Sequence, residues 1–181
     1  LSLTEKEIDE WKQAADNMYV PYDRGRGLYP QDDSFFNKKV WDFKNTSKEK
    51  YPLLLHFHPL NIYRHQVLKQ PDLVLALFLQ SRRFSRAEKK RNFDFYEPLT
   101  TGDSSLGPCV QCIMAVELGY TDLAYSYFMK TARMDLDDIN GNTADGIHLA
   151  ALGGTWMSLV YGFAGLRDDD GIMRFSPKLP A

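Results

Sequence analysis

Two stretches of the sequence place polar groups at the expected starts of helices. Gly102-Asp103-Ser104-Ser105 opens a helix predicted over 104–118, and Asp145-Gly146-Ile147-His148 opens the last predicted helix, with Gly153-Gly154 a turn further on. A helix N-terminus offers free N–H groups and the positive end of a dipole, which suits a phosphate. The structural alternative is that Ser104 and Asp145 are ordinary N-caps and that His148 is a satisfied core histidine.

Two carboxylates near the first stretch are candidates for acid–base chemistry. A carboxylate in a site can act as a general base that activates water. Glu97 and Asp103 are the local candidates for such a base. Alternatively, each is a structural carboxylate that accepts hydrogen bonds from backbone N–H groups.

The histidines, aspartates and cysteines elsewhere in the chain do not form the pattern of a metal-binding or redox site. His56 and His58 lack a nearby third ligand, and the aspartates of 135–138 and 168–170 lack the pattern of a calcium loop, so we expect solvated turns there and no metal. Cys109 and Cys112 lie within an apolar helical run and do not follow a strand, so we expect buried core thiols.

The elements that must position these residues are mostly helical. Thr4 and Glu7 form a potential capping box before a first helix that Pro21 ends. The aromatic-rich residues 22–59 predict an ordered loop that covers one end of a helical scaffold. The last helix is apolar nearly all round, which predicts burial. Further helices are predicted over 60–68, 72–83, 86–95, 104–118 and 121–135, with a strand at 172–175.

The link between two of these helices defines the architecture. Only two or three residues join 104–118 to 121–135, so the two helices are antiparallel neighbours. We therefore predict an all-α fold of helix hairpins with long loops at one end and a short β segment at the C-terminus. This pattern alone does not distinguish a ring of hairpins from a bundle or a solenoid.

Composition indicates one globular domain. The chain has 181 residues, of which 44% are hydrophobic. Its net charge of −2 argues against nucleic-acid binding. The longest apolar run, Leu73 to Leu79, is far shorter than the ~20 residues of a membrane span, and the first residues do not resemble a signal peptide. We expect a soluble, cytoplasmic protein that binds neither nucleic acid nor membrane.

Several spaced motifs occur in one order along the chain: Lys69–Asp72, Tyr96–Leu106, Thr131–Asp137, Asn142–His148, Gly153–Trp156 and Gly162–Gly165. Together they resemble the C-terminal half of the catalytic barrel of glycoside hydrolase family 65, which includes maltose, trehalose and kojibiose phosphorylases. The resemblance implies a partial (α/α)6 barrel, with residues 1–167 as the C-terminal portion of the barrel. Residues 168–181 would be an exit segment toward a missing C-terminal β-sandwich.

The resemblance also implies an activity. In the phosphorylases of this family, phosphate attacks the anomeric carbon of an α-glucosidic disaccharide, a glutamic acid protonates the leaving oxygen, and the product is β-glucose 1-phosphate. No cofactor is expected, because inorganic phosphate is a co-substrate. The general acid should precede Leu1, so we expect this chain to be inactive alone and to require the remainder of the barrel or a copy of itself as a partner.

The same resemblance assigns the site residues. It places Ser104, Ser105, His148, Gly153 and Gly154 around the phosphate, and Lys69, Gln70 and Glu97 around the glucose. The structural alternative for Lys69 is a solvated lysine at a helix start. The chain also departs from the family pattern, because Gly102 replaces a His, Gly107 replaces a Ser, and Ala150-Ala151 stands where many members have a Ser. Each change removes a polar group near the expected phosphate.

Two other functions are compatible with these features. One is a hydrolase with the same barrel, acting on trehalose or on a glucosylated conjugate. Inverting hydrolysis requires a base carboxylate roughly 6.5–9.5 Å from the acid, and Glu97 and Asp103 are the local candidates for it. The other is a noncatalytic helical module that binds sugar or another protein.

Overall fold

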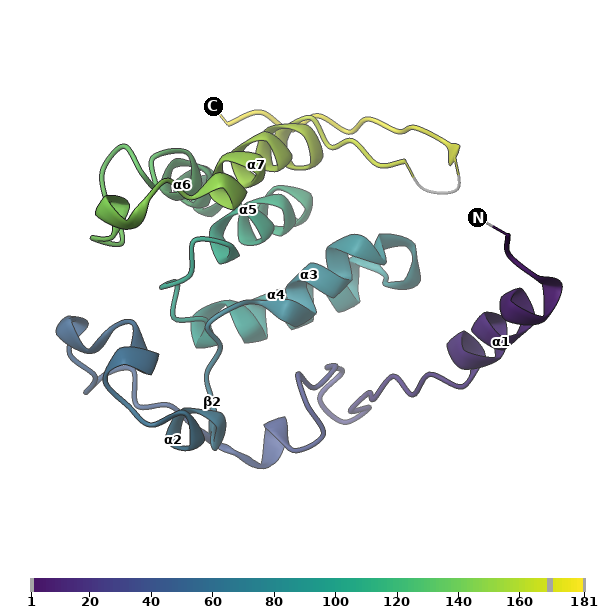
Figure 1. The fold of residues 1–181 in the computed structure, drawn as a ribbon, viewed down its shortest axis with the longest axis horizontal. Helices are drawn as coiled ribbons and strands as arrows, with labels where there is room; N and C mark the ends of the chain where they lie inside the picture. The colour runs from purple at the N-terminus through teal and green to yellow at the C-terminus, as the bar shows by residue number, and fades with distance from the viewer. Residues whose placement is uncertain (1, 169–170, 181) are drawn as a thin grey trace.

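The chain folds into stacked helices with one irregular region at the edge (Figure 1). The computed structural model describes residues 2–168 and 171–180. The all-α prediction is confirmed, with a single short pair of parallel strands, β1 (Lys39–Val40) and β2 (His65–Gln66), in the described part. The α-helices are α1 (Glu5–Asp16), α2 (Pro59–Tyr63), α3 (Asp72–Leu79), α4 (Arg86–Tyr96), α5 (Gly107–Leu118), α6 (Thr121–Ala132) and α7 (Leu149–Met157).

Helix α5 is the centre of the molecule. Eleven of its twelve residues are buried, and only Glu117 is not. It packs against α3, α4, α6 and α7 (Figure 1). Gly119 ends it in the left-handed conformation, at φ 92°, and the chain turns directly into α6. The predicted hairpin of two adjacent helices is therefore present. Cys109 and Cys112 are buried free thiols on α5, as predicted.

The end of the helical region differs from the prediction. The last helix starts at Leu149, because Gly146 at φ 122° interrupts the chain after a 3-10 helix, Thr143–Asp145. Beyond Met157 it continues as a π-helical segment, Ser158–Phe163. The predicted burial all round is wrong: Leu149 is 71% exposed and Trp156 is 56% exposed, so only one face of α7 packs on the core.

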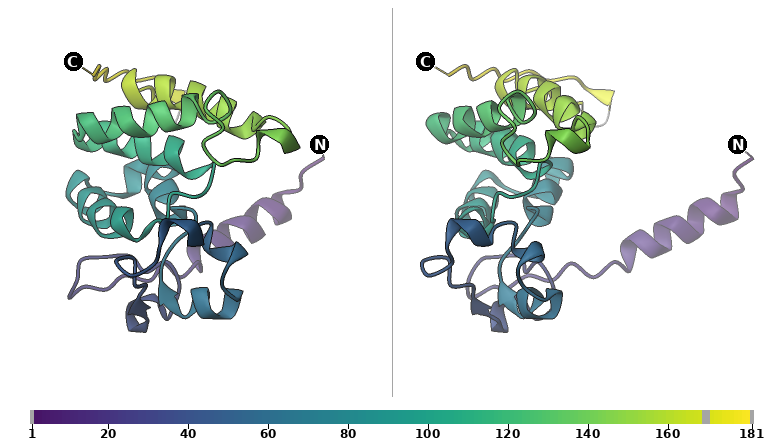
Figure 2. Two further views of the ribbon diagram at one scale, coloured as in Figure 1. Left: turned by 90° about the vertical axis from the view of Figure 1, so that its left-hand side faces the viewer. Right: turned by 60° about the vertical axis from the view of Figure 1, so that its left-hand side comes forward.

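Helix α1 stands apart from the other helices (Figures 1 and 2). Its predicted capping box is present, because Thr4 and Glu7 bond each other's backbone N–H groups. No residue of α1 is buried, however, and Trp11 is 59% exposed. The apolar positions of this helix therefore have no packing partner within the described chain.

Residues 22–59, which the sequence predicts as an ordered loop, hold more regular structure than expected and pack together with residues 60–67. Phe35 packs into the main core, whereas Trp41, Leu53, Ile62 and Val67 form a second, smaller core. Strand β1 pairs with β2 in this region, and the helix predicted over 60–68 is confined to α2. Three 3-10 helices, Phe35–Asn37, Lys48–Lys50 and Leu53–Leu55, complete the region.

The C-terminal residues return along the end of the π-helical segment. Arg167 and Arg174 form an isolated antiparallel bridge, and the Lys178 N–H donates to the Phe163 carbonyl (2.8 Å). Gly165, at φ 64°, lies so close to the Ser176 carbonyl that an added Cβ would collide with it. The strand predicted at 172–175 is reduced to this single bridge. Asp169 and Asp170 of the predicted turn lie outside the described residues.

Candidate functional site

One large cavity brings together most of the residues that the sequence analysis selected. Its volume is about 780 Å³. It is lined by four segments that are distant in the sequence, together with Lys130 of α6. These segments are residues 69–70, the loop 101–106, the loop between α6 and α7, and residues 51–55. The selected residues in its wall are Lys69, Gln70, Asp103, Ser104, Ser105 and His148.

Backbone pairing places the first two segments side by side. The Leu68 N–H donates to the Leu99 carbonyl (2.9 Å), and the Thr101 N–H donates to the Leu68 carbonyl (2.8 Å). This parallel bridge fixes residues 69–70 beside the 101–106 loop. Helix α5 begins at Gly107 and not at Ser104, so the two serines lie in the turn before the helix.

Ser104 is buried and has its acceptor positions occupied. Its Oγ accepts hydrogen bonds from Gln70 Nε2 (3.3 Å) and from the Leu106 N–H (3.2 Å). A hydroxyl has two lone pairs and one hydrogen, so the hydrogen of Ser104 is the group left to bond a ligand. An oxyanion or a sugar oxygen fits this requirement, because both accept hydrogen bonds. Gln70 thereby supports Ser104 as well as lining the cavity.

The two candidate base carboxylates have different surroundings. Asp103 lines the cavity, but its oxygens already accept bonds from the Thr101 hydroxyl (2.6 Å) and the Leu53 N–H (3.3 Å), as the structural alternative expected. Glu97 lies outside the cavity wall, at the end of α4, and accepts a bond from the Tyr127 hydroxyl (2.7 Å). Burial, and then this bond to Glu97, raises the pKa of Tyr127.

His148 faces the cavity while one side of its ring is held by Asp135. The Asp135 carboxylate accepts from the His148 backbone N–H (2.8 Å) and is bonded to His148 Nδ1 (2.5 Å). The side chains are 20% and 14% exposed. The prediction of a solvated turn is therefore wrong for Asp135. Asp145 does not cap α7, because His148 occupies the N-cap position.

Lys130 is a cavity residue that the sequence analysis missed. It projects from the last turn of α6, is partly buried, and its Nζ donates to the Gly102 carbonyl. Burial lowers the pKa of Lys130, and the nearby Asp103 carboxylate partly offsets this effect. A single lysine on an amphipathic helix has no sequence pattern that distinguishes it. Gly102, where the family pattern has a His, leaves the space into which Lys130 reaches, because an added Cβ would lie 3.2 Å from Nζ.

The paired glycines Gly153 and Gly154 lie away from this wall. Both are inside α7, and neither lines the cavity. Gly154 is the contact point between helices, because an added Cβ would lie 2.9 Å from Cys109 Cβ and Sγ. Gly153 is exposed and has open space around it. Gly154 therefore packs α7 against α5, whereas Gly153 makes no such contact.

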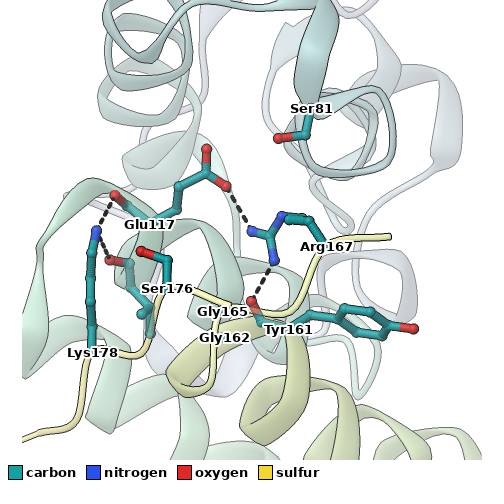
Figure 3. Close-up of a pocket in the computed structure, with 9 residues that line it drawn as sticks. Ser81, Glu117, Tyr161, Gly162, Gly165, Arg167, Ser176 and Lys178 are labelled. Carbon is teal, nitrogen blue, oxygen red and sulfur yellow. Dashed lines mark hydrogen bonds and ion pairs between the residues drawn. The ribbon is translucent and has the colours of Figure 1, made fainter. Parts of the chain in front are cut away.

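A second cavity, of about 150 Å³, lies where the C-terminal residues return along the helices (Figure 3). Its charged groups bond one another or the backbone. Arg167 bonds Glu117 (2.8 Å) and the Tyr161 carbonyl (2.7 Å), while Lys178 bonds the Glu117 carbonyl (2.9 Å) at the end of α5. Lys89 bonds the other oxygen of Glu117 (2.5 Å). This cluster joins α4, α5 and the C-terminal segment, and its groups are already paired.

Residues 2–168 and 171–180 contain neither a cluster of metal-ligand side chains nor a membrane-spanning helix. Within these residues, no group of three or more His, Cys, Asp or Glu side chains is arranged to hold a metal ion. None of the helices there combines the length and the apolar character needed to cross a membrane.

Comparisons with known proteins find similarity over nearly the whole chain. Residues 1–157 match the model of the glycosyl hydrolase family 65 central catalytic domain. The chain is 53% identical to an alpha,alpha-trehalose phosphorylase of Thermoanaerobacter brockii over 180 residues, which are 99% of this chain and 23% of that protein. It is 35% identical to the maltose phosphorylase of Bacillus subtilis, over 99% of this chain and 24% of that protein.

A solved structure shares the fold. It comes from the human microbiome and carries a provisional kojibiose phosphorylase name. It matches with a TM-score of 0.87 at 35% identity, over 98% of this chain and 26% of that one. The chain thus spans about a quarter of the length of the relatives it matches.

Proposed function

The chain belongs to glycosyl hydrolase family 65, and on this premise we propose that it supplies the phosphate-binding and glucose-binding loops of an inverting disaccharide phosphorylase. The observation that carries the proposal is the shared cavity, in which Ser104, Ser105 and His148 meet Lys69 and Gln70. An anion site and a sugar site must adjoin, because phosphate attacks the carbon of the bound glucose.

Each part of the cavity has a role in this proposal. Ser104 donates its hydroxyl hydrogen to the phosphate, with Ser105 and His148 as further donors, and Lys130 supplies a positive charge in the wall. Preorganised donors and charges in a partly buried site interact more strongly with an anion than the same groups in water. Phosphate is already ionised, so no carboxylate base is required. Lys69 and Gln70 bond glucose hydroxyls, which allows the site to reject epimers that leave these groups unpaired.

The general acid and the remainder of the barrel lie outside this chain in the proposal. The trehalose phosphorylase relative is about four times as long as the aligned segment, which leaves room for both. We therefore expect no turnover by the 181 residues alone, and measurable phosphorolysis by the isolated chain would contradict this part. The cytoplasmic location stays a prediction from the sequence.

A chimeric enzyme tests the proposal. The aligned segment of the Thermoanaerobacter brockii trehalose phosphorylase is replaced by this chain, and the matched control receives the segment of the Geobacillus stearothermophilus relative, which is also 53% identical to this chain. Trehalose is supplied with and without phosphate, and glucose 1-phosphate and free glucose are measured. We expect glucose 1-phosphate only when phosphate is present. Ser104→Ala in the chimera should raise the KM for phosphate by about tenfold.

The other two functions give different results in the same assay. A hydrolase segment would release free glucose at a rate independent of phosphate. A noncatalytic module would leave a folded chimera without turnover under either condition, while the control chimera stays active. Either result would overturn the proposed phosphorylase role. Circular dichroism of both chimeras establishes that the comparison is between folded proteins.

A further inference from the structure

The contact between Asp135 and His148 links the turn after α6 to the start of α7. Asp135 bonds both the backbone N–H and Nδ1 of His148, so it fixes the position of the residue and the orientation of its ring. The Thr143 backbone N–H donates to Asp138 in the same loop (3.0 Å), which adds a second hydrogen bond across this turn. His148 Nε2 has no bonded partner in the described residues, and His148 lines the large cavity.

The bond at Nδ1 determines what Nε2 can do. Because a carboxylate only accepts hydrogen bonds, Nδ1 must carry a hydrogen. In a neutral imidazole, Nε2 then has a lone pair, which faces a fully ionised oxyanion unfavourably. In an imidazolium, Nε2 carries a second hydrogen and donates to the oxyanion in a charge-assisted bond. A carboxylate bonded to Nδ1 is the partner that compensates the positive charge of an imidazolium.

Other charged residues line the same cavity or lie in the same loop as His148. Helix α7 itself has no charged residue. The charged groups around His148 comprise four carboxylates and two ammonium groups: Asp103, Asp135, Asp138 and Asp145 together with Lys69 and Lys130. Only Asp135 is bonded to the ring, and the bonds from the His148 side chain and backbone hold the pKa of Asp135 below its usual value. It therefore stays ionised at neutral pH.

We propose that Asp135 is a positioning residue that holds His148 as a protonated donor to the anion in this cavity. The identity of the anion as phosphate rests on the proposed function above. The consequence is a binding site whose affinity for a dianion falls as the imidazolium loses its proton. Asp135 has no contact with the cavity contents in this proposal and acts through His148 alone.

Anion binding by the 181-residue chain, labelled with ¹⁵N at histidine, tests the proposal. Sulfate is the probe, since it stays a dianion while phosphate titrates, and inorganic phosphate is measured in parallel. Affinity and the protonation of the ring nitrogens are followed by NMR from about pH 5 to pH 8. The variants are Asp135→Asn, which removes the charge and keeps an oxygen acceptor, and His148→Gln, which keeps a non-titrating N–H donor. Asp137→Asn, in the same turn but paired with Arg133, is the matched control.

In the wild type and in D137N, sulfate binding should weaken as His148 loses its proton. In D135N, the midpoint of this loss should move to lower pH, and binding at neutral pH should be about tenfold weaker. H148Q should bind with an affinity that no longer depends on pH in this range. This last variant keeps the test decisive if D135N does not fold.

Each contrary result has a distinct meaning. Two results would overturn the role of Asp135 when the wild type binds the anion. One is a pH dependence of binding in D135N that equals that of the wild type. The other is a pH dependence in H148Q that equals that of the wild type. Absence of sulfate and phosphate binding in the wild type would instead count against the proposed phosphate site. In that case the ring nitrogens still report whether Asp135 controls the protonation of His148, and an unchanged midpoint in D135N would overturn the inference as well.

Discussion

Lys130 places a positive charge in the partly buried wall of the large cavity. The loss of hydration of its ammonium group disfavours this charge. Burial disfavours the charged form of an amine, and this effect lowers the pKa of Lys130. Such a residue reduces the stability of the fold unless the buried charge is compensated, and the Gly102 carbonyl and the Asp103 carboxylate compensate it only in part. A bound anion would provide that compensation, so stability and ligand binding should respond in opposite directions when Lys130 is replaced.

We therefore expect Lys130→Met to bind sulfate and phosphate at least about tenfold more weakly than the wild type. In the absence of anion, the variant should be as stable as the wild type or more stable, because methionine fills a similar volume without a charge. Calorimetric titration and urea unfolding measure the two effects. Lys6→Met, at an exposed position of α1, is the control and should change neither.

The pH dependence of the K130M comparison has a defined sign. The pKa of Lys130 is lowered in the folded state from 10.5, so between the two values the unfolded chain binds more protons than the folded chain. Wild-type stability should thus rise relative to K130M as the pH increases toward 10.5. A difference that stays constant over this alkaline range would contradict the assignment.

At the scale of elements, the contact of α7 with α5 depends on one of two adjacent glycines. Gly154→Ala would place a Cβ 2.9 Å from Cys109 on α5, so the helices must separate, at a cost of about 1–3 kcal/mol. Gly153→Ala meets nothing within 4 Å and should stabilise α7 by up to about 1 kcal/mol. Urea unfolding measures both, and G153A should leave sulfate binding unchanged. Equal effects of the two substitutions would show that α7 does not pack as described.

Glu117 joins α4, α5 and the C-terminal segment. Burial alone would raise its pKa, but the bonds from Lys89 and then Arg167 outweigh burial and hold the pKa below 4.5. The stabilisation is fully present above pH 4.5 and is lost as the pH falls through the folded-state value. Glu117→Gln leaves the buried Lys89 ammonium without its carboxylate, which should cost about 3–5 kcal/mol at neutral pH.

Urea unfolding from neutral pH down to the acid transition measures this effect. The stability of E117Q should depend less on pH below 4.5 than that of the wild type. Glu49→Gln, an exposed carboxylate in the 3-10 helix Lys48–Lys50, is the control, and we expect it to match the wild type. A parallel pH dependence of E117Q and wild type would contradict the role of the cluster.

Local sequence patterns predict the helices well where the chain's own residues define the ends. The Thr4–Glu7 capping box and the Gly119 stop lie where the sequence indicates. The start of α7 was missed because Gly146 takes a positive φ, which the sequence pattern did not reveal. The pairing of β1 with β2 was missed because each strand has two residues, too few to show a period.

The sequence also predicted one part of the candidate site and missed another. The motifs predicted that the 101–106 loop, the 69–70 segment and His148 meet, and they line one cavity. Lys130 and Asp135 were missed because their roles depend on tertiary contacts, one with a backbone carbonyl 28 residues away and one with a ring 13 residues away. Glu97 was placed near the site by its position in a motif, but its side chain is bonded to α6 instead.

At the scale of the whole molecule, two exposed apolar faces stand out. Helix α7 and its continuation expose Leu149, Leu152, Trp156 and Leu159. Helix α1 exposes Ile8 and Trp11, and Met18 just after it is exposed as well. Contiguous apolar patches on a soluble surface usually mark contact sites. In the proposed enzyme, these faces would be covered by the remainder of the barrel, and in the isolated chain they remain open to self-association.

We expect the 181-residue chain to form concentration-dependent oligomers. Leu152→Glu combined with Trp156→Glu should shift it toward a monomer with unchanged helix content, measured by light scattering and circular dichroism. Tyr125→Glu, a similarly exposed position on α6, is the control and should not reduce association. A wild-type chain that stays monomeric at all concentrations would contradict this interpretation.

The enclosure of α5 has a practical consequence, because its two thiols record how often the molecule opens. Burial raises the pKa of Cys109, and raises that of Cys112 to about 11, so neither sulfur reacts as a thiolate while the helix is surrounded. The rate at which a thiol reagent labels them therefore reports transient exposure of the protein interior without an introduced label. An anion that contacts both the loop before α5 and the loop before α7 should slow that labelling.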